Sequence, residues 1–107
     1  MIAVFTESGL MARRLSALRP EQRIIALTHS PLVQRELALI WGVESLLTPE
    51  ASSTEEMVKS GEQILLAAGA VEIGEVIVAM AGKRSGLGLA SSVMLLTIGR
   101  TSGPVGA

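Results

Sequence analysis

The sequence contains no cysteine, no aspartate and no asparagine. Without cysteine, disulfide scaffolds, thiolate metal sites and cysteine nucleophiles are excluded. Without aspartate, the Ser-His-Asp triad, EF-hand calcium loops and the aspartate that usually holds a catalytic magnesium ion are excluded. Glutamate is the only carboxylate side chain and His29 the only imidazole. We therefore expect no catalytic activity from this chain alone, and no cofactor or metal.

Aromatic residues are also scarce, and the net charge is close to zero. Aromatics make up 2% of a sequence that is 49% hydrophobic, so aliphatic side chains must fill the core. Nine basic residues against ten acidic ones give a net charge of -1, which is too balanced for nucleic-acid binding or a polybasic membrane anchor. The longest apolar run, residues 64–71, is far below the roughly 18 residues that a bilayer needs. With no secretory signal either, the sequence favours a cytoplasmic protein without nucleic-acid or membrane partners.

Short apolar runs alternate with helical patterns along the 107 residues, which give room for one domain. The runs predict strands at residues 2–6, 24–28, 43–48, 75–81 and 92–98, and helices at 9–18, 31–41 and 54–68. This order predicts a three-layer α/β/α domain over residues 1–100, with a five-stranded, mostly parallel sheet. Residues 82–91 are expected to form a glycine-rich loop, whose length favours an antiparallel last strand. Residues 101–107 are expected to be a flexible tail.

Three serines stand where helix caps are expected. Ser8 is predicted to cap the first helix, Ser30 the second with Pro31 in its first turn, and Ser53 the third. Glu56, three residues after Ser53, completes a capping box.

Helical spacing predicts the side chains that face the sheet. The expected inward residues are Met11, Leu15 and Leu18; then Val33, Leu37, Ile40 and Trp41; then Met57, Gly61, Ile64, Leu65 and Ala68. Gly61 lies in mid-helix at a cost of up to about 1 kcal/mol relative to alanine, so it is expected to allow close packing on the sheet. Gly42 is expected to end the second helix in the left-handed conformation, and Gly69 is expected to end the third helix.

Ligands of open α/β sheets bind at the carboxyl ends of the strands. Residues 6–9, 28–31 and 82–88 are expected to meet there. In the first of these loops, Thr6 and Ser8 offer hydroxyl groups, and the amides of Gly9, Leu10 and Met11 open a helix N-terminus that suits a phosphate. The alternative, in which Ser8 only caps its helix, stays open.

The third loop carries two basic residues, Lys83 and Arg84. They are placed to close over an anion, or else are solvated charges on a loop. Gly86 and Gly88 do not form a dinucleotide fingerprint, because a strand follows them rather than a helix. His29 is interpreted as a loop residue without a catalytic task.

A series of motifs, in this order, resembles the C-terminal domain of pyruvate kinase. The motifs are Val4-Phe5-Thr6-Glu7-Ser8-Gly9, Arg19-Pro20, Ile24-Ile25-Ala26-Leu27-Thr28, Arg35-Glu36-Leu37-Ala38-Leu39-Ile40-Trp41-Gly42-Val43, Ser53-Thr54-Glu55-Glu56-Met57 and Gly74-Glu75-Val76-Ile77-Val78. The resemblance implies a five-stranded sheet with its last strand antiparallel. It also implies a domain without catalytic residues, since those of pyruvate kinase lie in a barrel that this chain lacks.

In many pyruvate kinases this domain binds an activating sugar phosphate, of which fructose bisphosphate is the best known. The resemblance carries that site to the loops at residues 6–11 and 82–91. The candidate effector or phosphate site is Thr6, Glu7, Ser8, Gly9, Leu10, Met11, Lys83, Arg84, Gly86 and Gly88. Leu10 and Met11 replace the polar or basic residues usual in the family, Glu7 adds a carboxylate, and Ala90-Ser91 replaces a common Thr-Asn pair. We therefore expect weak binding of a sugar phosphate or inorganic phosphate.

Two functions follow as hypotheses. The first is a regulatory and oligomerisation domain, either a fragment of a pyruvate kinase or a free-standing relative. The second is a stand-alone binding module for a small phosphorylated metabolite. The strand that begins at Ser92 and ends at Ile98 is apolar and expected at the sheet edge, which predicts a homodimer paired through it.

Overall fold

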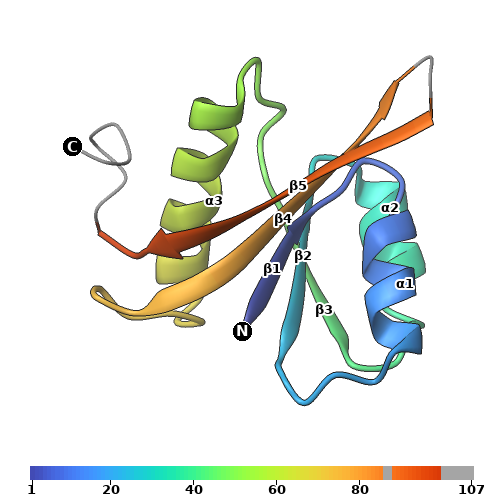
Figure 1. Ribbon diagram of the computed structural model, residues 1–107, viewed down its shortest axis with the longest axis horizontal. Coiled ribbons are helices and arrows are strands. Elements are labelled where there is room, and N and C mark those ends of the chain that lie inside the picture. The colour runs from blue at the N-terminus through green and yellow to red at the C-terminus, as the bar shows by residue number, and fades with distance from the viewer. Residues whose placement is uncertain (86–87, 100–107) are drawn as a thin grey trace.

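A computed structural model describes residues 1–85 and 88–99, which form one five-stranded sheet with helices on both sides (Figure 1). The elements in chain order are β1 (Ile2–Phe5), α1 (Leu10–Ala17), β2 (Ile24–Thr28), α2 (Pro31–Leu37), β3 (Val43–Leu47), α3 (Thr54–Ala67), β4 (Val76–Ser85) and β5 (Gly88–Thr97). The strand order is β3-β2-β1-β4-β5. β1 to β4 are parallel and β5 is antiparallel to β4, so the predicted fold class is confirmed. The expected tail at residues 101–107 lies outside the described residues.

The central strands are buried on both faces, as their continuous apolar runs predict. Phe5, Leu27 and Ala79 pack on the α3 side in a cluster that includes Leu65 of α3. On the other side, Ala26 of β2 packs with a second cluster, made of Ala12 of α1 and Val33 and Leu37 of α2. Figure 1 shows α3 on one side of β1 and β2 and the α1–α2 pair on the other.

The expected glycine-rich loop at residues 82–91 is wrong, because most of it is sheet. Lys83 pairs with Ala90, Arg84 with Leu89 and Ser85 with Gly88. Only two positions separate Ser85 from Gly88 along the chain, and a two-residue connection suffices to join antiparallel strands. The hairpin of β4 and β5 is therefore longer than the sequence predicts.

The predicted inward face of the first helix is also wrong. The buried residues of α1 are Ala12 and Ser16, whereas Leu18 lies beyond the helix and is 77% exposed. The N-cap is Gly9, not Ser8, and Gly9 has a φ of 84°. The small residues face inward because α1 packs close to the sheet. The Ser16 hydroxyl donates a hydrogen bond to the carbonyl of Trp41.

The second helix begins as predicted and ends early. Ser30 is its N-cap, with the Ser30 hydroxyl accepting from the N–H of Val33, and Pro31 lies in its first turn. The helix ends at Leu37, so Trp41 lies outside it and is 58% exposed, contrary to the expected inward position. The Arg19 guanidinium lies 4.0 Å from the centroid of the Trp41 ring, which gives the exposed indole a cationic partner.

Gly42 has the predicted left-handed conformation, with a φ of 71°. It ends the turn that leads into β3 rather than the helix itself, whose C-cap is Ala38. Gly69, with a φ of 72°, follows the C-cap of α3 as expected.

The capping box of the third helix is half confirmed. The Ser53 hydroxyl accepts from the N–H of Glu56 at 3.1 Å. The carboxylate of Glu56 turns to Ser52 instead of Ser53, accepting from the Ser52 amide at 3.1 Å and its hydroxyl at 2.6 Å. These two bonds, from the hydroxyl first and the amide second, lower the pKa of Glu56.

The buried face of α3 consists of Val58, Gly61, Glu62 and Leu65. Gly61 and Leu65 were expected there, whereas the expected Ala68 is exposed and the expected Met57 is half-buried. The inward face is therefore rotated by about one residue toward Glu62. No described helix is long and apolar enough to cross a membrane.

Candidate functional site at the carboxyl edge of the sheet

The carboxyl ends of β1, β2 and β4 lie at one edge of the sheet. Phe5, the last residue of β1, is level with Leu27 in β2 and Ala81 in β4. The Thr6 amide continues the ladder by donating to the carbonyl of Leu27 at 3.0 Å. The loops after β1 and β2 therefore begin side by side, as expected for this edge of an α/β sheet.

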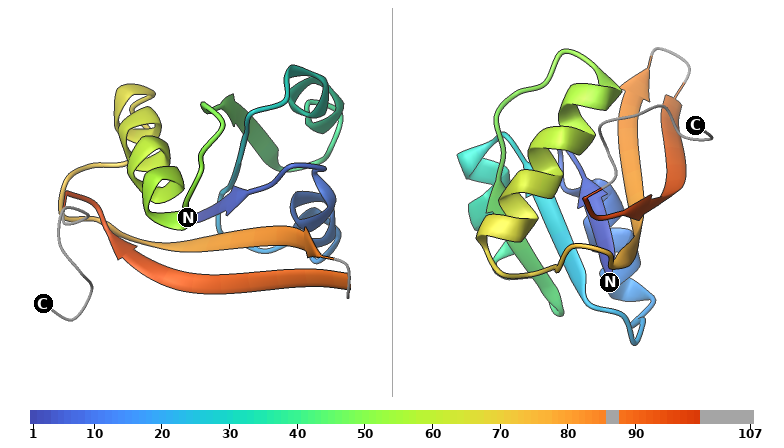
Figure 2. Two further views of the ribbon diagram at one scale, coloured as in Figure 1. Left: turned by 90° about the horizontal axis from the view of Figure 1, so that it is seen from above. Right: turned by 90° about the vertical axis from the view of Figure 1, so that its left-hand side faces the viewer.

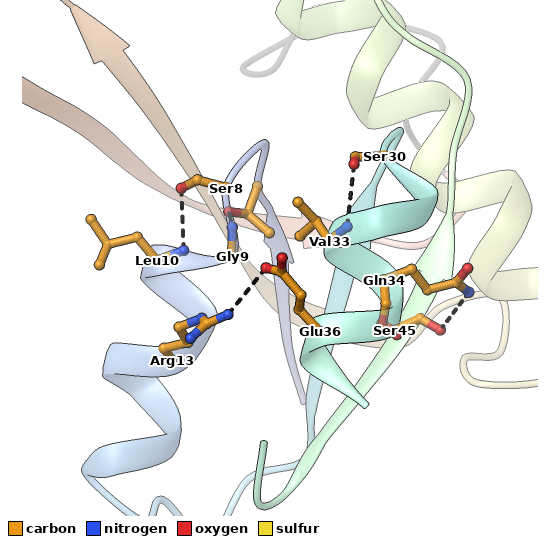
Figure 3. Close-up of polar contacts among 10 residues, drawn as sticks. Ser8, Gly9, Leu10, Arg13, Ser30, Val33, Gln34, Glu36 and Ser45 are labelled. Atoms are coloured by element: carbon orange, nitrogen blue, oxygen red, sulfur yellow. Dashed lines mark hydrogen bonds and ion pairs between the residues drawn. The ribbon is translucent and has the colours of Figure 1, made fainter. Parts of the chain in front are cut away.

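The loop after β1 is held by its own hydroxyl groups. Thr6 is buried, and its Oγ1 accepts from the N–H of Gly9 at 2.8 Å. The exposed Ser8 hydroxyl accepts from the N–H of Leu10 at 3.3 Å (Figure 3). Two of the three amides predicted to hold a phosphate are therefore already satisfied within the loop.

The third amide, that of Met11, has no acceptor among the described hydrogen bonds. Glu7 and Ser8, earlier in the same loop, are exposed. An anion at this position would meet one free amide directly, and would compete with Thr6 and Ser8 for the other two. The carboxylate of Glu7 opposes an anion electrostatically. This geometry favours weak binding over tight binding.

Gly9 is the point where α1 meets α2. A Cβ atom on Gly9 would lie 3.2 Å from Cδ2 of Leu37, and its φ of 84° disfavours any other residue. One turn further, Arg13 donates to Glu36 of α2 at 3.3 Å, an exposed ion pair that Figure 3 places between the two helices. These contacts fix where α1 begins relative to the second loop.

The second loop runs from Thr28 to Pro31 and is built in the same way. The buried Thr28 hydroxyl accepts from the N–H of Ser30 at 3.2 Å, and Ser30 in turn caps α2. His29 is exposed between them. Because β2 ends at Thr28 and α2 begins at Pro31, His29 lies in a loop as predicted.

The two basic residues of the candidate site lie on β4 rather than on a loop. Because Ala81 is level with Phe5, Lys83 and Arg84 extend past the end of β1 on the edge where the first loop lies. Gly88 is the first residue of β5, and Gly86 lies outside the described residues. The backbone therefore brings the two halves of the candidate site to the same edge. Their use by a ligand stays a prediction.

A buried carboxylate on α3 was missed by the sequence analysis. Glu62 is 6% exposed, and its Oε1 accepts from the N–H of Gly99, just after β5, at 2.6 Å. Its other oxygen, Oε2, has no hydrogen-bond partner among the described residues. The signal was present in the helical spacing of Val58, Gly61, Glu62 and Leu65. Glu62 lies near the end of β5 that is far from the hairpin tip, and it is separate from the candidate site.

Acidic side chains do not gather into a metal site in the described part of the chain. The clearest ion pair lies elsewhere, between Arg23 and Glu44, with Arg23 Nε 2.6 Å from Oε1 and Nη2 2.9 Å from Oε2 of Glu44. The hydrogen bonds from Arg23 lower the pKa of Glu44, and those to Glu44 raise the pKa of Arg23. The pair joins the start of β2 to β3.

Comparison with known proteins agrees with this fold. A family model described as "Pyruvate kinase, alpha/beta domain" matches residues 1–95. The chain belongs to this family. It is 38% identical over 98 residues to a pyruvate kinase of Lactococcus lactis, covering 92% of this chain and 20% of that protein. It is 40% identical over 82 residues to a pyruvate kinase of Agrobacterium vitis, covering 77% of this chain and 17% of that protein.

A solved structure, "Cryptosporidium parvum pyruvate kinase in complex with ADP", superposes with a TM-score of 0.76 at 26% identity. The superposition covers 91% of this chain and 20% of that one. The resemblance to the C-terminal domain of pyruvate kinase is therefore confirmed. This pyruvate kinase α/β domain spans about a fifth of the length of the relatives it matches.

Proposed function

We propose that this chain is a non-catalytic regulatory and oligomerisation domain of a pyruvate kinase. The observation that carries the proposal is the open edge of β5. β5 pairs with β4 on one side, and no other described strand lies beside it. Proteins seldom leave a long apolar edge strand unpaired, because its free amides and carbonyls invite another strand.

The hydrogen-bond pattern identifies which groups of β5 face that edge. Ile98 donates to the carbonyl of Glu75 and accepts from the amide of Gly74, both at 2.8 Å, so the polar groups of Ile98 point toward β4. Polar groups alternate in direction along an antiparallel strand. Those of Val93, Leu95 and Thr97 therefore point toward the open edge.

A second copy can satisfy this edge by pairing its own β5 antiparallel to the first. Such an isologous contact closes the assembly at two chains. We propose further that the loop from Thr6 to Met11, together with Lys83 and Arg84, receives a phosphate group of a sugar phosphate or inorganic phosphate. In such a regulatory domain, the hairpin of β4 and β5 connects the edge of the sheet that binds the ligand to the strand that pairs in the dimer.

Light scattering of the purified chain at micromolar concentration tests the oligomerisation. The expected mass is that of two chains. Leu95→Pro removes one amide that points to the open edge and leaves the β4 ladder intact, so it is expected to give a monomer. Leu39→Lys, on the exposed side of the turn after α2, is the control and should remain a dimer.

Circular dichroism and a urea unfolding curve establish whether Leu95→Pro is folded. A wild-type chain that stays monomeric contradicts the proposal. A folded Leu95→Pro variant that still dimerises places the interface elsewhere. The stand-alone binding module predicts phosphate binding without self-association, so the same measurement separates the two hypotheses.

A further inference from the structure

The buried carboxylate of Glu62 has one oxygen bound and one oxygen without a partner. Oε1 accepts from the Gly99 amide at 2.6 Å, whereas Oε2 is buried and has no donor among the described residues. Glu62 is only 6% exposed, so water has little access to it. Burying a charged group is costly unless it is hydrogen-bonded and paired with an opposite charge. Oε2 therefore needs a donor from outside the described residues.

The basic side chains near Glu62 in the described part of the chain do not supply this donor. The ion pairs there join Arg13 and Arg23 to other glutamates. Lys59 stands three positions before Glu62 on α3, but Lys59 is exposed whereas Glu62 is buried. A lysine at that position remains in water, so the partner of Oε2 must come from another direction.

The chain turns where it leaves β5, next to this carboxylate. Gly99 has a φ of 93°, and a Cβ atom there would lie 2.9 Å from Cγ2 of Ile73. In Figure 2 (left), α3 lies over the end of β5 that is far from the hairpin tip. The bond from Glu62 and the close approach of Ile73 therefore hold Gly99 beside α3. Arg100 follows directly, outside the described residues, with its Cα about 3.8 Å along the chain from that of Gly99.

We propose that the guanidinium of Arg100 donates to Oε2 of Glu62 and anchors the chain beyond β5 to α3. Two successive residues thereby bind the two oxygens of one carboxylate. Arg100 is the only charged residue after Arg84, so it is the one cation that this part of the sequence offers. An arginine keeps its charge when it is buried and presents several N–H donors, which suits a carboxylate that already uses one oxygen.

A double-mutant cycle in the full chain tests the pair by urea unfolding of wild type, Glu62→Gln, Arg100→Gln and the double variant. Glu62→Gln keeps an acceptor oxygen for the Gly99 amide but loses the charge. We expect Arg100→Gln alone to raise the unfolding equilibrium constant at least about tenfold, because it leaves a buried charge unpaired. In the Glu62→Gln background the same change should have less than about a twofold effect. Equal effects of Arg100→Gln in both backgrounds would overturn the proposal.

Two control variants separate this pair from a general effect of charge. Arg14→Gln, on the exposed side of α1 across the sheet, makes the same change in net charge and should act equally in both backgrounds. Lys59→Gln should do so too, and coupling of Lys59 rather than Arg100 to Glu62 would overturn the proposal. The coupling should persist at about 1 M salt, because buried charges are screened little. Its loss in salt would indicate an exposed contact and would also overturn the proposal.

NMR gives a second measurement that does not depend on the stability of a variant. The guanidinium N–H groups of Arg100 should include a resolved, slowly exchanging signal, because they are held at a buried carboxylate. Absence of this signal from Arg100→Gln assigns it, and in Glu62→Gln it should exchange as fast as the signals of Arg14. Fast exchange in wild type would overturn the proposal even if Glu62→Gln failed to fold.

The pair and the proposed function are tested independently. All chains in the cycle are compared at one protein concentration, because dissociation of a dimer would add to the unfolding free energy. The exchange measurement requires no dimer. A chain that stays monomeric can therefore still show the pair between Glu62 and Arg100, and a dimer can lack it.

Discussion

The ring of Phe5 in β1 lies directly against Gly61 of α3. A Cβ atom at position 61 would lie 2.5 Å from Cε1 and 2.6 Å from Cζ of the Phe5 ring. Real Cβ atoms do not approach so closely, so glycine is required for α3 to lie at this distance. Phe5 is buried and is followed directly by Thr6, the first residue of the candidate loop.

Gly61→Ala is expected to destabilise the protein by about 1 to 3 kcal/mol, the usual cost of overpacking a filled core. The gain in helix propensity, up to about 1 kcal/mol, offsets part of this. Urea unfolding measures the difference. In a Phe5→Leu background the ring is gone, so there the same substitution should be neutral or stabilising. Equal losses in both backgrounds would rule out the contact as the cause.

Glu62→Ala is expected to destabilise the protein by about 1 to 3 kcal/mol, because it removes the side-chain acceptor of the Gly99 amide. Hydrogen exchange of that amide should become faster, while exchange in the centre of β4 should not change. Glu62→Gln keeps an acceptor oxygen and should preserve slow exchange. Unchanged exchange at Gly99 in Glu62→Ala would show that the bond does not hold the end of β5.

Acid should weaken the link between β2 and β3. The folded-state pKa of Glu44 is lowered by its hydrogen bonds to Arg23, so the pair stabilises the fold above the ordinary glutamate pKa. This stabilisation is lost as the pH falls through the lowered pKa, because protonated Glu44 no longer pairs. Both side chains are at least half exposed, so the effect is below about 1 kcal/mol at neutral pH.

Glu44→Gln tests this link by urea unfolding at neutral pH and at about pH 2. The variant should be slightly less stable than wild type at neutral pH and equal to it in acid. Added salt should reduce the difference. Glu50→Gln, which removes an exposed charge outside the pair, is the control. A difference that persists in acid would contradict the ion-pair explanation.

The five strands, the antiparallel direction of the last one and two of the three helix starts could be predicted, because apolar runs, connection lengths and capping residues are local signals. Apolar runs indicated the buried strands, and the serines at positions 30 and 53 marked where α2 and α3 begin. Gly61 was predicted to permit close packing, and its contact with Phe5 confirms that. The helix ends were harder, since Trp41 is in helical register with Val33 and Leu37 but the helix ends before it.

The features that could not be predicted depend on contacts between residues that are distant in the sequence. Lys83 and Arg84 were assigned to a loop because glycines surround them, whereas pairing with β5 keeps them in a strand. Glu62 was overlooked because a carboxylate is rarely buried, and its acceptor role depends on Gly99, 37 positions away. At the candidate site, the sequence identified a turn that carries hydroxyl groups and backbone amides, and its use by a ligand stays a prediction. Only the folded backbone shows that the Thr6 and Ser8 hydroxyls accept hydrogen bonds from two of the three loop amides.

The charge of Glu7 should limit how tightly the first loop binds an anion. Wild type is expected to bind inorganic phosphate and fructose bisphosphate weakly, because Glu7 opposes the anion and two loop amides already have acceptors. Glu7→Gln removes the opposing charge and should tighten binding about two- to fivefold, the scale of one exposed charge at a few ångströms. Calorimetry at low salt measures both affinities. Glu21→Gln, at an exposed glutamate outside the candidate loop, makes the same change in net charge and should leave binding unaltered. Equal tightening in the two variants would mean that net charge alone attracts the anion, and tight binding by the wild type would contradict the inhibitory role of Glu7.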